Sequence, residues 1–451
     1  MYSREEAKTI TDKIFNMAKG ADAVEVDLTG SERSGTRWAN SSITVNLVQY
    51  DRSVTINVRV GQKTASGTTR DFSDASLQST INEAIETAKS RPDSPNLPEL
   101  LGAQTYIPVD AALPSGVNFG PRERAMMVKE SLDINEKRGT VGSGYIPKTD
   151  QTNVTANTKG LFAYYRSAEA GFVLTCRMPD GSGSGWAGIT GIKDVSMIKP
   201  TEITEIASKK ALDSRKAKAI EPGRYTVILE PRANARLLSL MTGIFNQGGG
   251  QGGPGGGGGG GGFGGGGGNN FMNGKKPGDK IFSELFTLKS DIGNPILRQT
   301  PILQDNRPAA PVTWVENGIL KNFANGQPAN VNMSLSLGGS DKSIADLVKD
   351  TRRGLLVTFF WYIRGVPAEG QPLLNTGMTR DGLFLIEKGE IVGPVQNFRW
   401  NMSPLVAYNN ISAVGKAVPI HTGESYDGGG TALVPPVRIE DFFMTSVSPA
   451  V

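Results

Sequence analysis

The residue types that carry most enzyme chemistry are scarce in this sequence of 451 residues, which holds one histidine, His421, and one cysteine, Cys176. A zinc motif that needs two histidines, such as HExxH, HExxxH or HxxEH, therefore cannot occur in the chain. One cysteine also excludes an intrachain disulfide and any site with several thiolate ligands. We accordingly predict no metal ligand and no catalytic residue in this chain.

Neither of the two residues stands in a pattern that is typical of a nucleophile and its base. A Ser-His-Asp site would have to use His421, which stands in a loop-like setting, and we interpret it as a surface or hydrogen-bonded residue. Cys176 ends an apolar, strand-like stretch, which favours a small buried residue over a nucleophile. Carboxylate pairs are too common in the sequence for one to be singled out.

Two glycine motifs resemble phosphate-binding loops without meeting their requirements. Gly183, Gly185 and Gly188 fit GxGxxG, but the residues that follow predict a strand, so no helix N-terminus is offered to a pyrophosphate. Gly274 precedes two lysines, yet the spacing of GxxxxGK[ST] fails at both ends. We predict a dinucleotide site in neither place.

The charge balance argues against a dedicated nucleic-acid binder, because 48 Lys and Arg stand against 44 Asp and Glu. A basic run at 209–218 shares its predicted helix with Glu202, Glu205 and Asp213, and we interpret it as a solvated helix face rather than a nucleic-acid contact. No apolar run approaches 18 residues and the N-terminal residues lack a signal-like apolar core, which predicts a cytoplasmic protein without membrane contact.

Hydrophobic periodicity predicts an α+β protein of three parts. Residues 1–98 form a helix and antiparallel-strand domain, and residues 115–218 form a middle α/β domain. Residues 223–451 form a strand-rich C-terminal domain with a flexible Gly-rich loop at 247–270. The predicted helices cover 3–19, 76–90, 122–137, 203–212, 233–245 and 343–352. The predicted strands cover 24–28, 43–47, 54–60, 160–165, 171–177, 225–229, 355–363, 383–387 and 437–443, with a turn at 50–52.

Five stretches, at 20–44, 53–70, 343–358, 376–404 and 434–443, together resemble the TldD/PmbA family over nearly the whole chain. The resemblance implies a pair of homologous subunits. The TldD type carries HExxxH on a helix and is a zinc metallopeptidase, and the TldE (PmbA) type lacks the zinc ligands. The pair encloses a cavity in which unfolded peptides are cut. An older association with DNA gyrase gave the family its other name, and our charge argument leaves that function the weakest.

The resemblance places the family's metal helix at 239–244, where Ser239 and Ile244 stand at the two histidine positions and Leu240 at the glutamate position. The family's cysteine ligand near the C-terminus has no counterpart. This implies a TldE-type subunit with a vestigial site, no cofactor of its own, a TldD-like HExxxH homologue as heterodimer partner, and zinc in that partner. Arg380 and Asp381 in the most family-like stretch either contact a peptide or form a structural turn pair.

Three functions remain open at this point. The first is a non-catalytic subunit of a zinc metallopeptidase that acts on unfolded peptides. The second is a metal-free, peptide-binding homo-oligomer, and the third is a peptidase with its own Ser/Lys or carboxylate chemistry. The Gly-rich tract either covers the mouth of the cavity as a lid or is a tolerated expansion of a surface loop.

Overall fold

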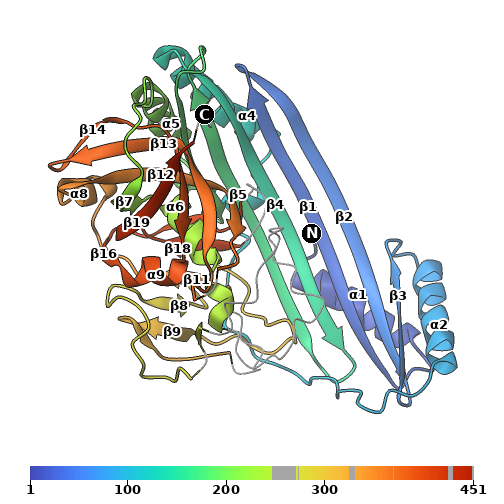
Figure 1. Ribbon diagram of the computed structural model, residues 1–451. Helices are drawn as coiled ribbons and strands as arrows, with labels where there is room; N and C mark the ends of the chain where they lie inside the picture. The colour runs from blue at the N-terminus through green and yellow to red at the C-terminus, as the bar shows by residue number, and fades with distance from the viewer. Residues whose placement is uncertain (246–270, 273, 325–330, 369, 425–429, 449–451) are drawn as a thin grey trace.

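The computed structural model describes residues 1–245, 271–272, 274–324, 331–368, 370–424 and 430–448, so the predicted Gly-rich loop at 247–270 lies outside the described residues. The chain is α+β and rich in strands, which confirms the predicted fold class (Figure 1). None of the described helices is both long and apolar enough to span a membrane.

A six-stranded sheet organises the N-terminal half in the order β3-β2-β1-β4-β5-β6, and all neighbours are antiparallel. Strands from the predicted N-terminal domain and from the predicted middle domain share this sheet, while the boundary between the two domains stays a prediction. The strands are β1 (Ala23–Ala39), β2 (Ser42–Val60), β3 (Lys63–Thr69), β4 (Val141–Asn157), β5 (Phe162–Arg177) and β6 (Ser184–Ile192).

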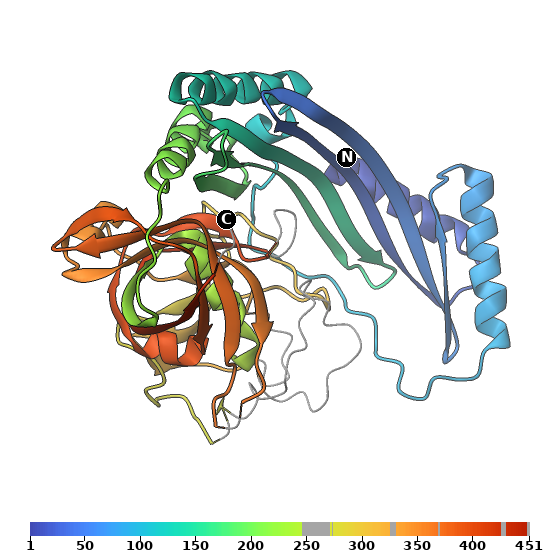
Figure 2. The same cartoon turned by 45° about the horizontal axis from the view of Figure 1, so that its top comes forward.

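Helices cover one face of this sheet in two groups (Figure 2). At one end α1 (Arg4–Met17) and α2 (Asp74–Ser90) bury the alternate apolar residues of β1 and β2. At the other end lie α3 (Pro114–Val117), α4 (Pro121–Arg138) and α5 (Pro200–Asp213). Cys176 is buried beneath α4 and α5, and burial raises the pKa of its thiol to about 11, which disfavours the reactive thiolate.

The predicted turn at 50–52 is wrong, because β2 continues through it and Asp51 pairs with Ser31. The chain reverses instead at Asn40 and Ser41, whose φ values of 49° and 62° are left-handed. Exposed polar residues inside a strand have the same composition as a turn, so the local sequence alone does not distinguish the two. The GxGxxG match lies largely inside β6, which continues to Ile192, so the residues that follow the match are a strand, as predicted.

Two further sheets make up the C-terminal half. One has the order β12-β7-β19-β15-β13-β14 with β16 beside β19, and pairing of β12 with β13 closes five of its strands into a ring. The other has the order β10-β9-β8-β11-β18-β17. The ring sheet contains β7 (Gly223–Leu229), β12 (Arg353–Gly365), β13 (Asn375–Glu387), β14 (Glu390–Pro394), β15 (Phe398–Met402), β16 (Ile411–Val414) and β19 (Val437–Val447). The second contains β8 (Leu288–Ser290), β9 (Val312–Glu316), β10 (Ile319–Leu320), β11 (Leu335–Leu337), β17 (Val418–His421) and β18 (Thr431–Val434).

Helix α6 (Pro231–Ser239) packs between these two sheets, and Leu237 and Leu238 are fully buried there. The predicted helix at 233–245 is therefore too long: α6 ends at Ser239, and a separate 3-10 turn covers Thr242–Phe245. Two short helices, α8 (Ile344–Lys349) and α9 (Pro404–Asn409), complete this half.

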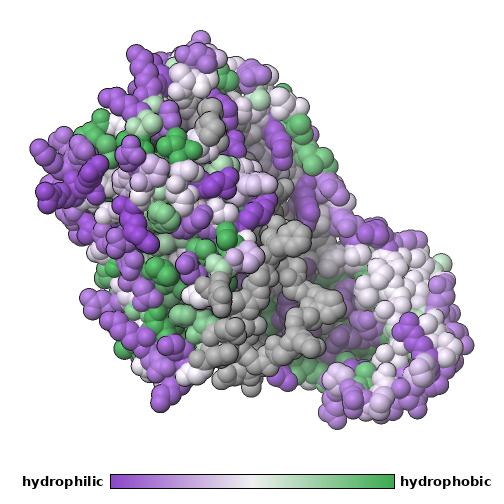
Figure 3. Space-filling model, in the orientation of Figure 1, coloured by the Kyte–Doolittle hydropathy of each residue, from purple (hydrophilic) through white to green (hydrophobic). Residues whose placement is uncertain are grey.

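The two halves meet at β6, which contacts β13 and β17. There Gly191 has a φ of +69°, and a Cβ at this position would lie 1.9 Å from Thr431 Oγ1, so only glycine fits. The long strands diverge from the C-terminal half, and Figure 3 shows this face of the molecule hollowed between that half and the sheet end near α2. On the sheet face without helices, Asp27 is bonded to Asn57 and Thr155.

Candidate functional site

Arginines of α6 dominate the region where the sequence places the family's metal helix. Arg232 donates to the backbone oxygens of His421 and Glu424, and its guanidinium lies 5.1 Å from the centre of the Phe359 ring. Arg236, one turn later on the helix, donates to Thr422 O at 2.8 Å. Both side chains are buried because α6 lies under the segment that follows β17. We call these two residues and Arg364, which lies on β12, the arginine cluster.

Glu424 supplies the carboxylate among these guanidiniums. Its Oε2 lies 3.5 Å from Arg364 Nη1, and its Oε1 accepts the N–H of Ile363 at 3.3 Å. Burial lowers the pKa of Arg236, while Glu424 raises it and Arg364 lowers it, which shows that both groups are near. Among the described residues, Glu424 is the carboxylate that these contacts place beside Arg236 and Arg364.

These donors do not fit a zinc ion. Zinc is held by thiolate, imidazole or carboxylate groups, whereas guanidiniums repel a divalent cation and have no lone pair to offer at neutral pH. Within the described ranges, no three His, Cys, Asp or Glu side chains are grouped so that they could hold a metal ion. The arrangement instead suits anionic groups such as carboxylates.

The vestigial positions do not lie on one continuous helix. Ser239 is the last residue of α6, and its hydroxyl donates to Arg236 O at 2.8 Å. Leu240 is the half-buried C-cap, and Ile244 is buried in the main hydrophobic core. His421 ends β17, where its N–H donates to Thr190 Oγ1 at 2.9 Å.

A buried ionic chain connects α5 to the start of α6. Lys210 Nζ lies 2.7 Å from Glu230 Oε2, and the side chains are 14% and 11% exposed. Glu230 Oε1 accepts a hydrogen bond from the Thr358 hydroxyl at 3.2 Å, and Lys210 also donates to Trp186 O at 3.3 Å. The chain thus joins the N-terminal half to β12 of the C-terminal half.

Arg380 and Asp381 lie beside this ionic chain, at an irregularity where β13 pairs with β12. Asp381 has a φ of 53° and is buried, and its Oδ1 has no hydrogen-bond partner among the described residues. Burial raises the pKa of the Asp381 carboxyl, although Arg380 and Ser184 oppose that effect. Arg380 remains 32% exposed, with its guanidinium 5.3 Å from the centre of the Trp361 ring. The structure therefore brings together Arg380, which is accessible, and Asp381, which is not.

Replacing Asp381 with asparagine is expected to stabilise the protein more at neutral than at acid pH. Because the pKa of Asp381 is higher in the folded chain than its ordinary value of 3.8, the wild type loses stability as pH rises from 3.8 through the folded value. Asparagine has no such titration, and it tolerates a left-handed φ. Melting temperatures of both proteins between about pH 4.5 and about pH 7.5 test this. A difference that does not grow with pH would contradict it.

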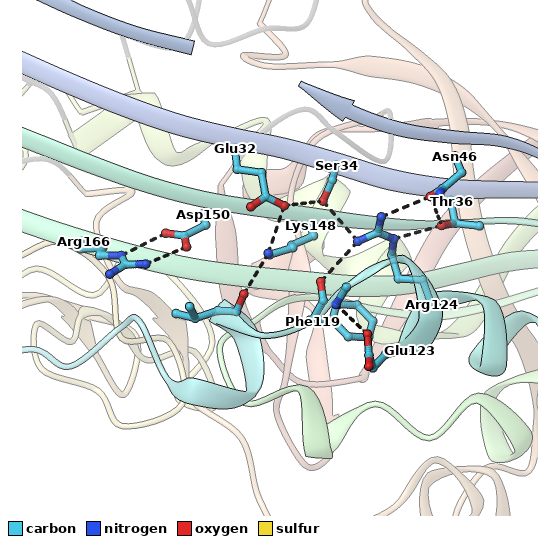
Figure 4. A network of polar contacts seen from close by, with 12 residues as sticks. Glu32, Ser34, Thr36, Asn46, Phe119, Glu123, Arg124, Lys148, Asp150 and Arg166 are labelled. Carbon is cyan, nitrogen blue, oxygen red and sulfur yellow. Dashed lines mark hydrogen bonds and ion pairs between the residues drawn. The ribbon is translucent and has the colours of Figure 1, made fainter. Parts of the chain in front are cut away.

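A second buried polar network lies between the sheet and α4 (Figure 4). Arg124 is fully buried, and its guanidinium donates to Thr36 Oγ1, Ser34 Oγ and Asn46 Oδ1 at 3.0, 3.2 and 3.2 Å. It also donates to the backbone oxygen of Phe119 at 3.3 Å. Sequence reasoning missed this network. The available signal is the helical spacing of Arg124, Val128, Ser131 and Asn135, which are the buried residues of α4.

Comparison with known proteins identifies the family. The model of the PmbA/TldA metallopeptidase central domain matches residues 130–215, and that of the PmbA/TldA metallopeptidase C-terminal domain matches residues 222–446. No curated protein matches the chain.

Three solved structures share the fold over nearly their whole length. A putative modulator of a DNA gyrase from Thermotoga maritima is 17% identical with a TM-score of 0.76, and 97% of this chain covers 99% of that one. TldE from Thermococcus kodakarensis is also 17% identical with a TM-score of 0.76, with coverage of 97% and 100%. A putative modulator of DNA gyrase from Bacteroides thetaiotaomicron is 15% identical with a TM-score of 0.73, with coverage of 99% and 100%. With the two domain models, which together match most of the sequence, these likenesses lead to one conclusion: the chain belongs to the TldD/PmbA family.

Proposed function

We propose that this chain is the non-catalytic, TldE-type subunit of a heteromeric TldD/TldE-type zinc metallopeptidase that acts on unfolded peptides in the cytoplasm. One observation carries the proposal. The sequence of this family member holds one histidine, so HExxxH cannot be formed. Activation of a zinc-bound water needs the ligands and the base together. The TldD-like partner would supply all of them.

The role of this chain would be to complete the substrate cavity and to hold an extended peptide. Arg380, whose guanidinium lies over the Trp361 ring, and Arg364, which is 39% exposed, would offer positive charge to carboxylates of the peptide. Main-chain hydrogen bonds to a strand would add affinity with little sequence preference. Such a surface suits unfolded peptides of varied sequence.

Co-expression with the HExxxH homologue of the same genome tests the proposal. We expect the two chains to purify together with zinc and to cleave an unfolded peptide such as reduced, alkylated lactalbumin. A chelator, or Gln in place of the Glu of the partner's HExxxH, should abolish cleavage. Chelator-resistant cleavage by this chain alone would overturn the proposal, and so would its isolation without the homologue.

A further inference from the structure

The free edge of β2 is the most unusual surface of the N-terminal half, and we infer that this chain pairs there with the corresponding edge of its homologous subunit. The inference rests on the proposed function, because it names the surface through which the heteromer forms. It goes beyond that function in assigning the contact to one strand and one mode of pairing, namely antiparallel addition of strand to strand.

The edge is long and its backbone is unpaired. β3 pairs only with residues 54–60 of β2, so residues 42–53 pair with β1 on one side and with no other strand in the described part of the chain. Twelve extended residues span about 40 Å. The N–H and C=O groups that point away from β1 along this length are a template for another strand.

The side chains on this edge are apolar although they are exposed. Val45 and Leu47 share one face with exposures of 47% and 52%, and Ile43, which lies beyond a bulge and pairs with Trp38, is 44% exposed. Val48 and Tyr50 lie on the other face and are 40% and 72% exposed. Residues 42–50 contain no charge and no proline. Proteins normally protect free edges with lysine, proline or a bulge. Of these features, residues 42–50 hold just one, a bulge between Ile43 and Val45, so the apolar stretch that follows the bulge is expected to be covered.

A subunit of the same fold is the occupant that this edge fits. About a two-fold axis perpendicular to the sheet, the two edges pair antiparallel and the same faces of both sheets lie on one side. Pairing centred on Asn46 would set Val45 opposite the partner position that corresponds to Leu47, and the apolar residues of both chains would form one patch. Because residues 42–50 carry no charge, this chain places no charge opposite the partner's edge.

The position of the edge argues against a substrate peptide. β2 lies toward one end of the sheet, whereas β6 at the opposite end contacts β13 and β17 of the C-terminal half. A peptide added to β2 would therefore lie on the side away from the arginine cluster (Figure 1). A subunit added there would join two six-stranded sheets into one.

The test replaces Val45 and Leu47 together with lysine in the full chain, co-expressed with the HExxxH homologue. Both side chains are about half exposed, so we expect the variant to fold, which circular dichroism and thermal melting check. The matched control replaces Ile391 and Val392, which are 48% and 52% exposed on the edge strand β14. We expect V45K/L47K to weaken binding of the homologue by at least about tenfold, measured by sedimentation, and I391K/V392K to leave it unchanged.

Hydrogen exchange gives a second readout, because the amides of residues 42–53 should gain protection in the wild-type complex. If the wild type binds the homologue and V45K/L47K binds equally well, the edge inference is wrong and the proposed function stands. If the edge gains protection only when peptide is added, the occupant is the substrate and the inference is overturned. If the wild type does not bind the homologue at all, the proposed function fails, and the edge inference fails with it.

Discussion

Replacing Lys210 with methionine is expected to lower the free energy of unfolding by about 3–5 kcal/mol. Methionine retains most of the apolar stem and volume, so the change removes the ammonium group rather than the packing. Glu230 would keep its charge in a position that is 11% exposed, with the Thr358 hydroxyl at 3.2 Å as its remaining side-chain donor. A buried carboxylate without a counter-charge is costly because water no longer solvates it.

Lys209 is the matched control, since it precedes Lys210 on α5 and pairs with Asp213 in solvent, where its side chain is 72% exposed. Lys209→Met should change the free energy of unfolding by less than about 1 kcal/mol. Urea titration followed by near-ultraviolet circular dichroism measures both variants. Equal losses of unfolding free energy in the two variants would show that the buried pair contributes no more to stability than the exposed pair.

A double variant separates the ionic interaction from the packing. Adding Glu230→Gln to Lys210→Met removes the orphaned charge, so the double variant should be more stable than Lys210→Met alone. Thr358 can still donate to the amide oxygen, which keeps one bond of the chain. If the losses of unfolding free energy in Lys210→Met and in Glu230→Gln simply add in the double variant, Glu230 does not depend on Lys210 and the prediction is wrong.

Helix α4 shows how far periodicity alone can be used. The sequence predicts a helix at 122–137, and the structure has Pro121–Arg138. Its Met126, however, is 59% exposed, whereas Arg124 is fully buried. Apolar spacing finds the helix, but it assumes that the buried face is apolar. Here polar partners on β1 and β2, far away in the sequence, satisfy the buried face instead.

The predictions of a turn at 50–52 and of a helix that continues to 245 are wrong for a related reason. Sheet pairing, not local composition, makes 50–52 part of β2, because β1 continues beside it and the ladder is unbroken there. The predicted helix at 233–245 contains no proline, and α6 ends at Ser239 within a densely packed core. Contacts between distant segments decide both features, and a single sequence does not reveal them.

The candidate site was reached through resemblance more than through chemistry. Arg380 and Asp381 come from the most family-like stretch, and the structure separates them into an accessible side chain and a buried one. Lys210, Glu230 and Thr358 come from three elements with no common spacing, so no motif could have identified the ionic chain. The single histidine, by contrast, is decisive from sequence, because it excludes HExxxH in any register.

Replacing Arg124 with methionine is expected to lower the free energy of unfolding by about 3 kcal/mol. The change keeps the buried stem but leaves Phe119 O and Asn46 Oδ1 without the guanidinium donors at 3.3 and 3.2 Å. Arg124→Lys should recover only a small part, since one ammonium cannot reach acceptors on three elements at once. Urea titration compares both variants with the wild type.

Arg122 provides the control, because it lies on the exposed side of the same helix. Arg122→Met should stay within about 0.5 kcal/mol of the wild type. Hydrogen exchange should place the damage of Arg124→Met in α4 and in the stretch of β2 around Asn46, and not in β7 or β12. Because that stretch carries the free edge, Arg124→Met should also weaken binding of the homologous subunit while every edge residue is intact. Exchange that rises evenly across both halves of the chain would contradict a local role for Arg124.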